Sequence, residues 1–333
     1  MTTQLQNYLN VKHSTSNLTD EQFELIVGDL AEQLEQISFI PSYTNAQLYQ
    51  DWQNLKKWTT KDNYINSTNR VGMKLCEHFF PNFYDIADNK GNTFKTMWQK
   101  DNLIKILRWN RKSHSTPYLS ELKRGIYFCC GMTKSTMYRP QMSKMICDTY
   151  SPKIVLDPCM GWGGRLLGAV ASGTHYIGFD PNTETFNNLK RMVKFLEIEN
   201  KVTLICDDAM NMAKYNLPKV DLIITSPPYF DLEVYTNEDT QSINKHSNYR
   251  SWSDYFLKGI IENTTCLLNE NGVSCWNVGK VGKNDMKDDV KNYHNGIGFK
   301  FEKEFKVVSS KRQALQTTDN KKSNDNTVIY VHI

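Results

Sequence analysis

The stretch from residue 220 to residue 230, VDLIITSPPYF, constrains the fold of this chain most. Its apolar part is unbroken and β-branched, as in a strand buried on both faces of a parallel sheet. Pro227 and Pro228 then end the strand, because proline has no N–H to continue a ladder and biases Ser226 away from helix. A hydroxyl, exposed carbonyls and the ring of Tyr229 therefore meet at the carboxyl end of a central strand, where open α/β sheets bind ligands.

Such a turn suits the chemistry of a nucleobase amine. The lone pair of that amine is delocalised into the ring, so two acceptors fixed on its two N–H groups would pull the nitrogen toward a reactive tetrahedral state. The Ser226 hydroxyl and the Pro227 carbonyl would be those acceptors, and Tyr229 would stack on a base taken out of its helix. A proline pair before a tyrosine is also an ordinary strand-ending turn, so this stretch alone leaves both interpretations open.

Residues 225–229, TSPPY, resemble the catalytic motif of the amino-methyltransferases, the S-adenosylmethionine-dependent DNA enzymes that methylate N4 of cytosine or N6 of adenine. The resemblance implies S-adenosylmethionine as the cofactor and four catalytic residues, Ser226, Pro227, Pro228 and Tyr229. In that family a serine at the head of the motif goes more often with cytosine N4, and aspartate or asparagine with adenine N6. Cytosine N4 is therefore the favoured target and adenine N6 the alternative.

A second motif lies upstream, where residues 154–167 read IVLDPCMGWGGRLL. An apolar strand is followed by a glycine-rich turn, which lets the backbone approach a ligand closely, and by apolar residues at helical spacing. Other nucleotide-binding folds share such a loop, but the missing Gly-Lys-Ser/Thr argues against a phosphate loop. The stretch resembles the methyltransferase motif Asp-Pro-x-x-Gly-x-Gly. This implies that the methionine end of the cofactor is held by Asp157, Pro158, Cys159, Gly161 and Gly163.

The next strand, residues 175–179, leads into Asp180 and Pro181. An acid about 20 residues beyond the first turn is where a doubly wound sheet places the carboxylate that binds ribose hydroxyls. Helix capping is the alternative role for an acid at this position. Both roles are compatible here, with Asp180 on the ribose and Asn182 or Thr183 as the cap.

The third strand, residues 202–206, leads into Asp207, Asp208 and Ala209. This run is similar to the family's acid that meets the adenine amino group, and Asp208 is favoured over Asp207 because it directly precedes the alanine. Four strand ends in sequence thus carry residue types that the cofactor or the amine needs. We predict an α/β fold: a doubly wound, mostly parallel sheet of the class I methyltransferase type with a terminal antiparallel hairpin, plus a helical N-terminal extension.

Charge is distributed unevenly along the chain. Residues 1 to about 60 read as an acidic helical leader, with a capped helix starting near Thr19. Between residues 90 and 145 basic residues far outnumber acidic ones, with Trp98, Trp109, Tyr118, Tyr127 and Phe128 interleaved. The whole chain carries only +4, so this stretch has the charge of a surface that tracks phosphates. A solvated basic face is the alternative. Its basic residues are Lys90, Lys95, Lys100, Lys105, Arg108, Arg111, Lys112, Lys123, Arg124, Lys134, Arg139 and Lys144.

We therefore expect two parts, a helical region over residues 1–115 that contacts DNA or recognises the target, and a methyltransferase domain over residues 116–333. Residues 137–146 resemble the element that closes over the methionine end of the cofactor. Residues 231–250 form a long polar connection beside the expected base pocket and read as a lid or base-recognition loop. Residues 309–326 read as a mobile hairpin tip.

Composition adds further expectations. No apolar run approaches the roughly 18 to 20 residues of a membrane span and the N-terminus is polar, so we expect a cytoplasmic protein that contacts no membrane. The eight cysteines show no Cys-x-x-Cys pair and no zinc spacing, which predicts reduced core residues such as Cys206 and Cys275, and no metal. Cys159 follows a proline, as in cytosine C5 methyltransferases, but its place in the glycine motif favours a structural role.

The favoured function is methyl transfer from S-adenosylmethionine to cytosine N4 of a base flipped out of double-stranded DNA, as in restriction–modification or phage systems. Three alternatives stay open. They are an adenine-N6 DNA methyltransferase, an RNA or protein-glutamine amino-methyltransferase, and a DNA-binding module of the same fold without activity.

Overall fold

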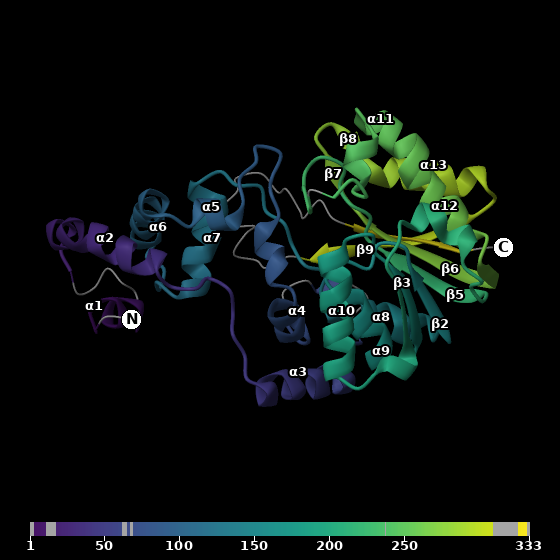
Figure 1. Ribbon diagram of the computed structural model, residues 1–333, viewed down its shortest axis with the longest axis horizontal. Helices are drawn as coiled ribbons and strands as arrows, with labels where there is room; N and C mark the ends of the chain where they lie inside the picture. The colour runs from purple at the N-terminus through teal and green to yellow at the C-terminus, as the bar shows by residue number, and fades with distance from the viewer. Residues whose placement is uncertain are drawn as a thin grey trace. The chain divides into compact units, whose positions relative to one another are not determined.

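The computed structural model describes residues 3–10, 18–61, 65–66, 69–236, 238–308 and 326–331 (Figure 1). The chain divides into two compact units. The helical unit comprises Met1–Pro41, Pro81–Ser135 and Leu232–Tyr235, and the sheet unit comprises Ser42–Phe80, Thr136–Asp231 and Thr236–Ile333. The predicted boundary at residue 115 differs from this division, because residues 42–80 group with the sheet and residues 116–135 with the helical unit.

The sheet unit is built on one sheet with the strand order β1-β9-β10-β6-β5-β2-β3-β4. Strands β2 to β6 pair in parallel, and β10 runs antiparallel to both β6 and β9. The strands are β1 (Ile65–Asn66), β2 (Ile154–Asp157), β3 (His175–Phe179), β4 (Val202–Ile205), β5 (Val220–Thr225), β6 (Leu268–Val278), β9 (Lys300–Val308) and β10 (Asn326–Val331). The doubly wound, mostly parallel sheet with an antiparallel last strand is therefore confirmed. A separate pair is formed by β7 (Lys280–Val281) and β8 (Asn284–Asp285).

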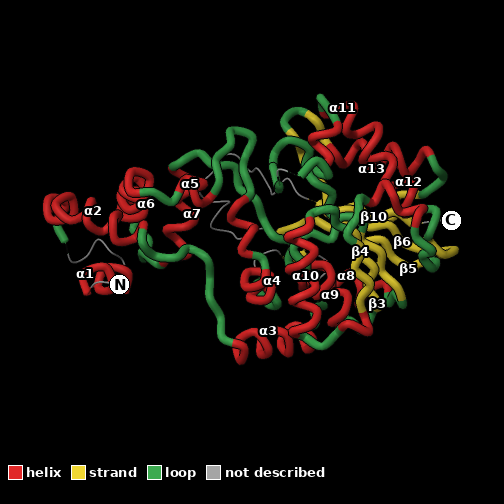
Figure 2. Tube along the Cα trace, in the orientation of Figure 1, coloured by secondary structure: helices red, strands yellow, loops and turns green. Residues whose placement is uncertain are grey.

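Helices cover both faces of this sheet. Figure 1 shows α8, α9 and α10 on one side and α12 and α13 on the other, and Figure 2 shows the strands gathered between them. The helices of the unit are α3 (Asn45–Lys57), α4 (Met73–Phe79), α8 (Pro140–Tyr150), α9 (Gly164–Ala171), α10 (Thr183–Phe195), α11 (Tyr249–Trp252), α12 (Lys258–Thr265) and α13 (Met286–Gly296). One π-helical turn, η5 (Ser253–Leu257), links α11 to α12, and the short 3-10 turns are η2 (Glu199–Lys201), η3 (Ala209–Lys214) and η4 (Ser242–Lys245).

Polar contacts join the early helices α3 and α4 to each other and α3 to α10 of the sheet unit. The Asp51 carboxylate on α3 is buried and accepts hydrogen bonds from the backbone N–H groups of Gly72 (3.1 Å) and Lys74 (2.9 Å). The Tyr49 hydroxyl donates to the carbonyl of Phe195 at the end of α10 (3.0 Å). These contacts link positions far apart in sequence, so local pattern does not predict them.

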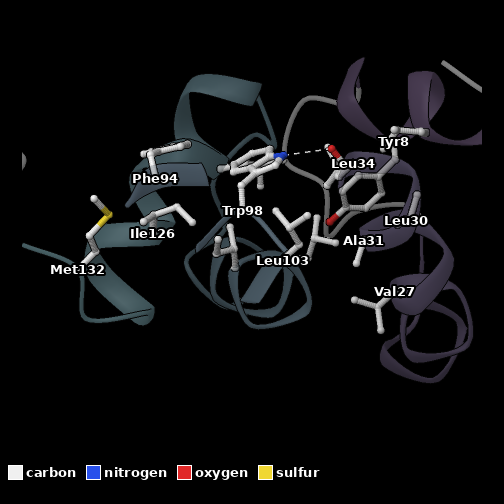
Figure 3. Packing of buried hydrophobic residues seen from close by; sticks show 14 of the residues in the cluster. Tyr8, Val27, Leu30, Ala31, Leu34, Phe94, Trp98, Leu103, Ile126 and Met132 are labelled. Carbon is white, nitrogen blue, oxygen red and sulfur yellow. Dashed lines mark hydrogen bonds between the residues drawn. The ribbon is translucent and has the colours of Figure 1, made fainter. Parts of the chain in front are cut away.

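The helical unit contains α1 (Thr3–Asn10), α2 (Asp20–Glu35), the 3-10 turn η1 (Pro81–Asp85), α5 (Phe94–Met97), α6 (Lys100–Lys112) and α7 (Leu119–Cys129). The predicted cap at Thr19 is confirmed, since Thr19 and Gln22 form a reciprocal capping box. Figure 3 shows the core, in which the Trp98 indole N–H donates to the carbonyl of Leu34 (3.2 Å). Trp98 is only 3% exposed, so it belongs to this core and not to a phosphate-tracking surface.

Opposite charges in the helical unit pair across α2 and α6. Lys100 lies 2.7 Å from Glu32, Arg108 lies 2.5 Å from Glu24, and Arg111 contacts Asp20 at 2.9 Å. The acidic leader and part of the basic stretch therefore neutralise each other in the fold. Because Lys100, Glu32, Arg108 and Glu24 are well exposed, water screens the first two pairs and they contribute little to stability.

Three smaller expectations differ from the structure or lie outside it. Cys206 is exposed just past the end of β4, so its assignment to the core is wrong, whereas Cys275 is buried as expected. The long connection 231–250 contains the 3-10 turn η4 and enters α11. The expected hairpin tip lies outside the described residues except for Asn326, which begins β10. Among the helices that the structure describes, none has the length and apolarity to cross a membrane.

Candidate active site

Four neighbouring strand ends carry the predicted site residues. In the sheet, β5, β2, β3 and β4 are adjacent and parallel, so their carboxyl ends lie at one edge. Asp157 ends β2, and Ser226 follows directly after β5. The chain moves outward from β2 through β3 to β4 and then returns to β5, so β2 and β5 flank the point where strand order reverses. Ligands bind at this point in doubly wound sheets.

Asp157 is the centre of a buried hydrogen-bond network. Its Oδ2 accepts from the Arg165 Nε and from the Tyr176 hydroxyl, both at 2.6 Å. Its Oδ1 accepts from the Thr225 hydroxyl at 2.9 Å and from the Cys159 backbone N–H at 3.1 Å. The carboxylate thus joins β2 to β3, to β5 and to the start of α9. Four donors use the four lone-pair directions of a carboxylate, so the network fixes the backbone around Asp157.

The glycine turn after β2 adopts left-handed backbone angles. Gly161 has φ +50° and Gly163 has φ +73°, a region that glycine enters without steric cost. A Cβ at Gly161 would have only the Cys159 carbonyl (3.9 Å) and the Arg165 Nη2 (4.0 Å) nearby, so there is space beside this backbone. Pro158 is buried, and burial raises the pKa of the Cys159 thiol well above its usual value, which keeps it a thiol and a poor nucleophile.

Asp180 connects the glycine turn to the end of β3. Its Oδ2 accepts from the Gly161 N–H at 2.9 Å and its Oδ1 from the Asn182 N–H at 3.0 Å. Burial raises the pKa of Asp180 to about 6. Each oxygen keeps a second acceptor direction, as two ribose hydroxyls would need. Asn182 caps α10 by accepting from the Thr185 N–H (2.8 Å), so the predicted cap is confirmed, and Pro181 between the two is half-buried.

The two acids after β4 have different surroundings. Asp207 accepts from the Asn211 amide and from the Tyr215 hydroxyl, each at 2.8 Å. Burial acts to raise the pKa of Asp207, but these hydrogen bonds outweigh it and lower the pKa. Asp208 is buried, caps the 3-10 turn η3 that begins at Ala209, and forms an ion pair with Lys245 at 2.6 Å. The Asp207 carboxylate is thus hydrogen-bonded within its own turn. The Asp208 carboxylate instead contacts Lys245, in the segment that follows the proline turn.

The proline turn is held from both sides. Ser226, Pro228 and Tyr229 are half-buried and Pro227 is buried. The Asn277 amide on β6 donates to the Ser226 hydroxyl oxygen (3.4 Å), because the register pairs Thr225 with Trp276 and so brings the next two residues side by side. On the other side Phe230 takes φ +48° and its ring lies 5.9 Å from the ring of Trp252.

Sequence reasoning missed four residues of this edge, Arg165, Tyr176, Thr225 and Asn277. Arg165 was visible in the glycine motif, and a charged residue inside an apolar helix start is a signal for a buried ion pair. Tyr176, Thr225 and Asn277 depend on strand register, which the chain does not reveal locally. The structure brings the predicted strand-end residues to one edge and adds the network that fixes them.

The sequence of this chain is similar to the sequences of several methyltransferases. The sequence profile of the RNA cap guanine-N2 methyltransferase family matches residues 152–262. A release factor glutamine methyltransferase from Clostridium botulinum is 25% identical over 154 residues, which are 44% of this chain and 53% of that protein. The type II methyltransferase M.MjaVI from Methanocaldococcus jannaschii is 30% identical over 115 residues, 33% of this chain and 56% of that protein. The chain spans about half the length of these curated relatives.

The sheet unit has the class I methyltransferase fold. Among solved structures, a Streptococcus mutans protein in complex with SAH shares 18% identity and a TM-score of 0.39, over 60% of this chain and 100% of that chain. S-adenosylmethionine, the predicted cofactor, is supported by the family match. The groups at this edge of the sheet unit fit it. Asp180 offers acceptors for ribose hydroxyls, Asp208 offers one for an adenine amine, and the turn at Gly161 leaves room for the methionine end.

Proposed function

We propose that the chain transfers a methyl group from S-adenosylmethionine to the exocyclic amine of a DNA base, with cytosine N4 as the favoured target. The observation that carries the proposal is the position of Ser226. It follows β5 directly, beside the end of β2 and its glycine turn, where the strand order of the sheet unit reverses. The Ser226 hydroxyl, an acceptor for an amine, and the glycine turn, a binding site for a methyl donor, therefore lie at the ends of the adjacent strands β5 and β2.

The protein's own part in this reaction is to bind and orient. The Ser226 hydroxyl accepts from Asn277 and retains a second lone pair for one N–H of the amine, while the Pro227 carbonyl serves the other. Tyr229 supplies a ring for the base. The bound cofactor supplies a methyl group on a positively charged sulfonium. The amine would attack that methyl carbon as the C–S bond breaks to leave a neutral thioether, and the methylated amine would then release one proton to solvent. Alignment and acceptor placement would therefore carry most of the catalysis.

The preference for cytosine N4 comes from the serine at the head of the TSPPY motif. An aspartate or asparagine at this position would favour adenine N6 by the same resemblance. A nucleic-acid substrate is also supported by the match to the RNA cap guanine-N2 methyltransferase profile. Adenine N6 stays the alternative within DNA.

A second candidate is methylation of RNA. The profile that matches residues 152–262 is that of RNA cap guanine-N2 methyltransferases, and guanine N2 is also an amine conjugated to a ring. The glutamine amide of a release factor, the substrate named for another relative, has the same conjugated NH₂ group. The three candidates share the acceptor pair of the proline turn and differ in what surrounds the amine.

One experiment separates these candidates. The purified chain is incubated with methyl-labelled S-adenosylmethionine and, separately, with duplex DNA, RNA and a release factor. Labelled substrate is digested, and mass spectrometry identifies the modified base or residue. Label as N4-methylcytosine in DNA supports the favoured proposal, and label at guanine N2 of RNA supports the second candidate. Transfer to none of the three, by a chain that still binds SAH in calorimetry, would favour a binding module without activity.

A further inference from the structure

The helices α6 and α7 pack closely in the helical unit. A Cβ at Gly125 on α7 would lie 2.6 Å from the Ile106 side chain on α6, so only glycine allows this approach. Leu103, Ile106 and Leu122 are fully buried in the core on the inner side. Close packing places the outer faces of the two helices next to each other. The side chains on the outer faces of α6 and α7 therefore form one continuous surface.

Aromatic rings and basic groups share this outer surface. The rings of Trp109 on α6 and Phe128 on α7 stack with centroids 5.7 Å apart and planes 15° apart. The Arg124 guanidinium lies 5.5 Å from the Phe128 ring. Phe128 is 51% exposed, and Tyr118, just before α7, is 52% exposed. Rings of this size normally enter the core, but both remain at the surface, and Phe128 lies beside the Arg124 cation.

Two lysines on the same face of α6 keep their charge available. Lys105 and Lys112 are seven residues apart, and Trp109 lies between them on the same face of the helix. The acids of α2 pair with Lys100, Arg108 and Arg111, and in the described part of the chain no carboxylate pairs with Lys105 or Lys112. Arg124 is paired with Glu121 at 2.7 Å, so it contributes its planar group more than net charge.

We propose that this surface, made by Lys105, Trp109 and Lys112 of α6 with Tyr118, Arg124 and Phe128 of α7, binds single-stranded nucleic acid. Exposed rings stack on bases only where neighbouring bases leave a face open, which excludes the interior of a duplex. The lysines reach the phosphates on either side. Lysine is depleted in the buried centres of protein–protein interfaces, so its position here favours a phosphate-bearing partner. The inference goes beyond the proposed function, because it assigns to the helical unit a surface for single strands that is separate from the candidate active site of the sheet unit.

Binding of labelled oligonucleotides to the full chain tests this without any methyl transfer. Single-stranded DNA, single-stranded RNA and duplex DNA of about 12 pairs or nucleotides are titrated by fluorescence anisotropy at several salt concentrations. Replacing both rings, Tyr118→Ala with Phe128→Ala, should weaken single-strand binding by at least about fivefold, since stacking of one base contributes roughly 1 to 3 kcal/mol. The matched control is Tyr255→Ala, because Tyr255 is also an exposed ring (70%) but lies in the sheet unit, outside the proposed surface.

Salt dependence tests the lysines separately. Each phosphate contact on a single strand contributes about 0.7 to the slope of log K against log salt, so Lys105→Gln with Lys112→Gln should lower that slope by about 1.4. Lys100→Gln is the control on the same helix, because Lys100 is held by Glu32 and should leave the slope unchanged.

Two results would overturn the inference: ring variants that bind single strands like the parent chain, or a duplex that binds as tightly as a single strand and loses as much affinity in those variants. Circular dichroism verifies that the variants fold, which is expected because the replaced rings are exposed. A chain that binds single strands through this surface yet methylates nothing would refute the proposed function alone. A chain that methylates DNA while the variants bind normally would refute this inference alone.

Discussion

Asp180 is the carboxylate whose ionisation should control cofactor affinity. Burial raises its pKa to about 6, so it loses its charge within a pH range where most carboxylates stay ionised. A carboxylate accepts from two ribose hydroxyls better than a carboxylic acid does, because protonation turns one acceptor into a donor. We expect calorimetry to show SAH affinity falling toward tenfold per pH unit below about pH 6. Asp180→Asn should bind more weakly at pH 7.5 and show no such dependence.

Asp207 is the control for this prediction. Its hydrogen bonds lower its pKa, so it stays ionised between about pH 5 and pH 7.5, and Asp207→Asn should leave the pH profile of SAH binding as it is in the parent chain. If Asp180→Asn retained the full pH dependence, the titrating group would be another residue and the ribose role of Asp180 would be refuted.

Ser226 should separate turnover from cofactor binding. Ser226→Ala removes the hydroxyl that accepts from Asn277, and with it one proposed acceptor for the amine, but touches none of the hydrogen bonds around Asp157 or Asp180. We expect kcat to fall by roughly 10²-fold, as for loss of one preorganised transition-state hydrogen bond, with SAH affinity unchanged. Abolished SAH affinity in calorimetry would show that the assigned division of roles is wrong.

At this scale, local sequence predicts residues whose role follows from neighbours in the chain. The position of Asp180 after its strand and the cap at Asn182 belong to that group. Tyr176 and Asn277 could not be assigned in the same way. Their partners lie 19 and 51 positions away, and these contacts exist only once β3 and β6 take their register.

At the scale of elements, the approach of α8 to α9 holds the glycine turn in place. A Cβ at Gly168 on α9 would lie 2.2 Å from the Pro140 carbonyl oxygen and 2.6 Å from the Lys144 backbone nitrogen. Neither backbone atom can move unless α8 moves. We therefore expect Gly168→Ala to destabilise the sheet unit by about 3 kcal/mol, measured as a lower midpoint in urea unfolding.

Gly28→Ala is the matched control for that change. Gly28 lies inside α2, and a Cβ there would have no atom within 4 Å. In a helix interior alanine is favoured over glycine by about 0.5 to 1 kcal/mol, so the same substitution should stabilise the helical unit. Equal stability of Gly168→Ala and the parent chain would show that α8 and α9 are not constrained by this contact.

The strands were predictable because apolar β-branched runs are local signals, and β2, β3, β4 and β5 lie where those runs occur. Strand β6 starts earlier than its apolar run suggests, at Leu268, since sheet pairing continues through polar residues. The helical stretch from α11 to α12 is divided by a π-helical turn at Ser253–Leu257. A single π-helical turn holds about one residue more than an α-helical turn. This leaves the hydrophobic pattern of the sequence almost unchanged, so the sequence does not predict it.

At the scale of the whole molecule, charge was the property that sequence described least well. The basic stretch 90–145 reads as one phosphate-binding surface, but the fold gives Lys100, Arg108 and Arg111 acidic partners. Whether a charge faces solvent or a partner depends on which helices become neighbours, and no local pattern contains that information. The rings and lysines left on the outer face of α6 and α7 are a smaller and more specific surface.

Global stability should also depend on a buried histidine. The Nδ1 of His294 lies 2.8 Å from the Val290 carbonyl, so it carries the proton, and Nε2 accepts from the Ser274 hydroxyl at 2.9 Å. Burial lowers the pKa of His294 to about 4, below its unfolded value near 6.5. The unfolded chain therefore binds a proton first as pH falls. Stability from this group is complete above about pH 6.5 and is lost progressively toward pH 4.

The expected loss from His294 is about 2 kcal/mol at pH 5, measured by urea unfolding. Asp180 opposes it, because its raised pKa makes the folded form take up a proton first, so the parent chain alone shows a smaller net decline. The comparison with His294→Gln isolates the histidine: the variant should be less stable at pH 7 but lose less stability on acidification. An identical pH dependence in both chains would mean that His294 is not kept neutral by burial, and that protonation elsewhere drives acid unfolding.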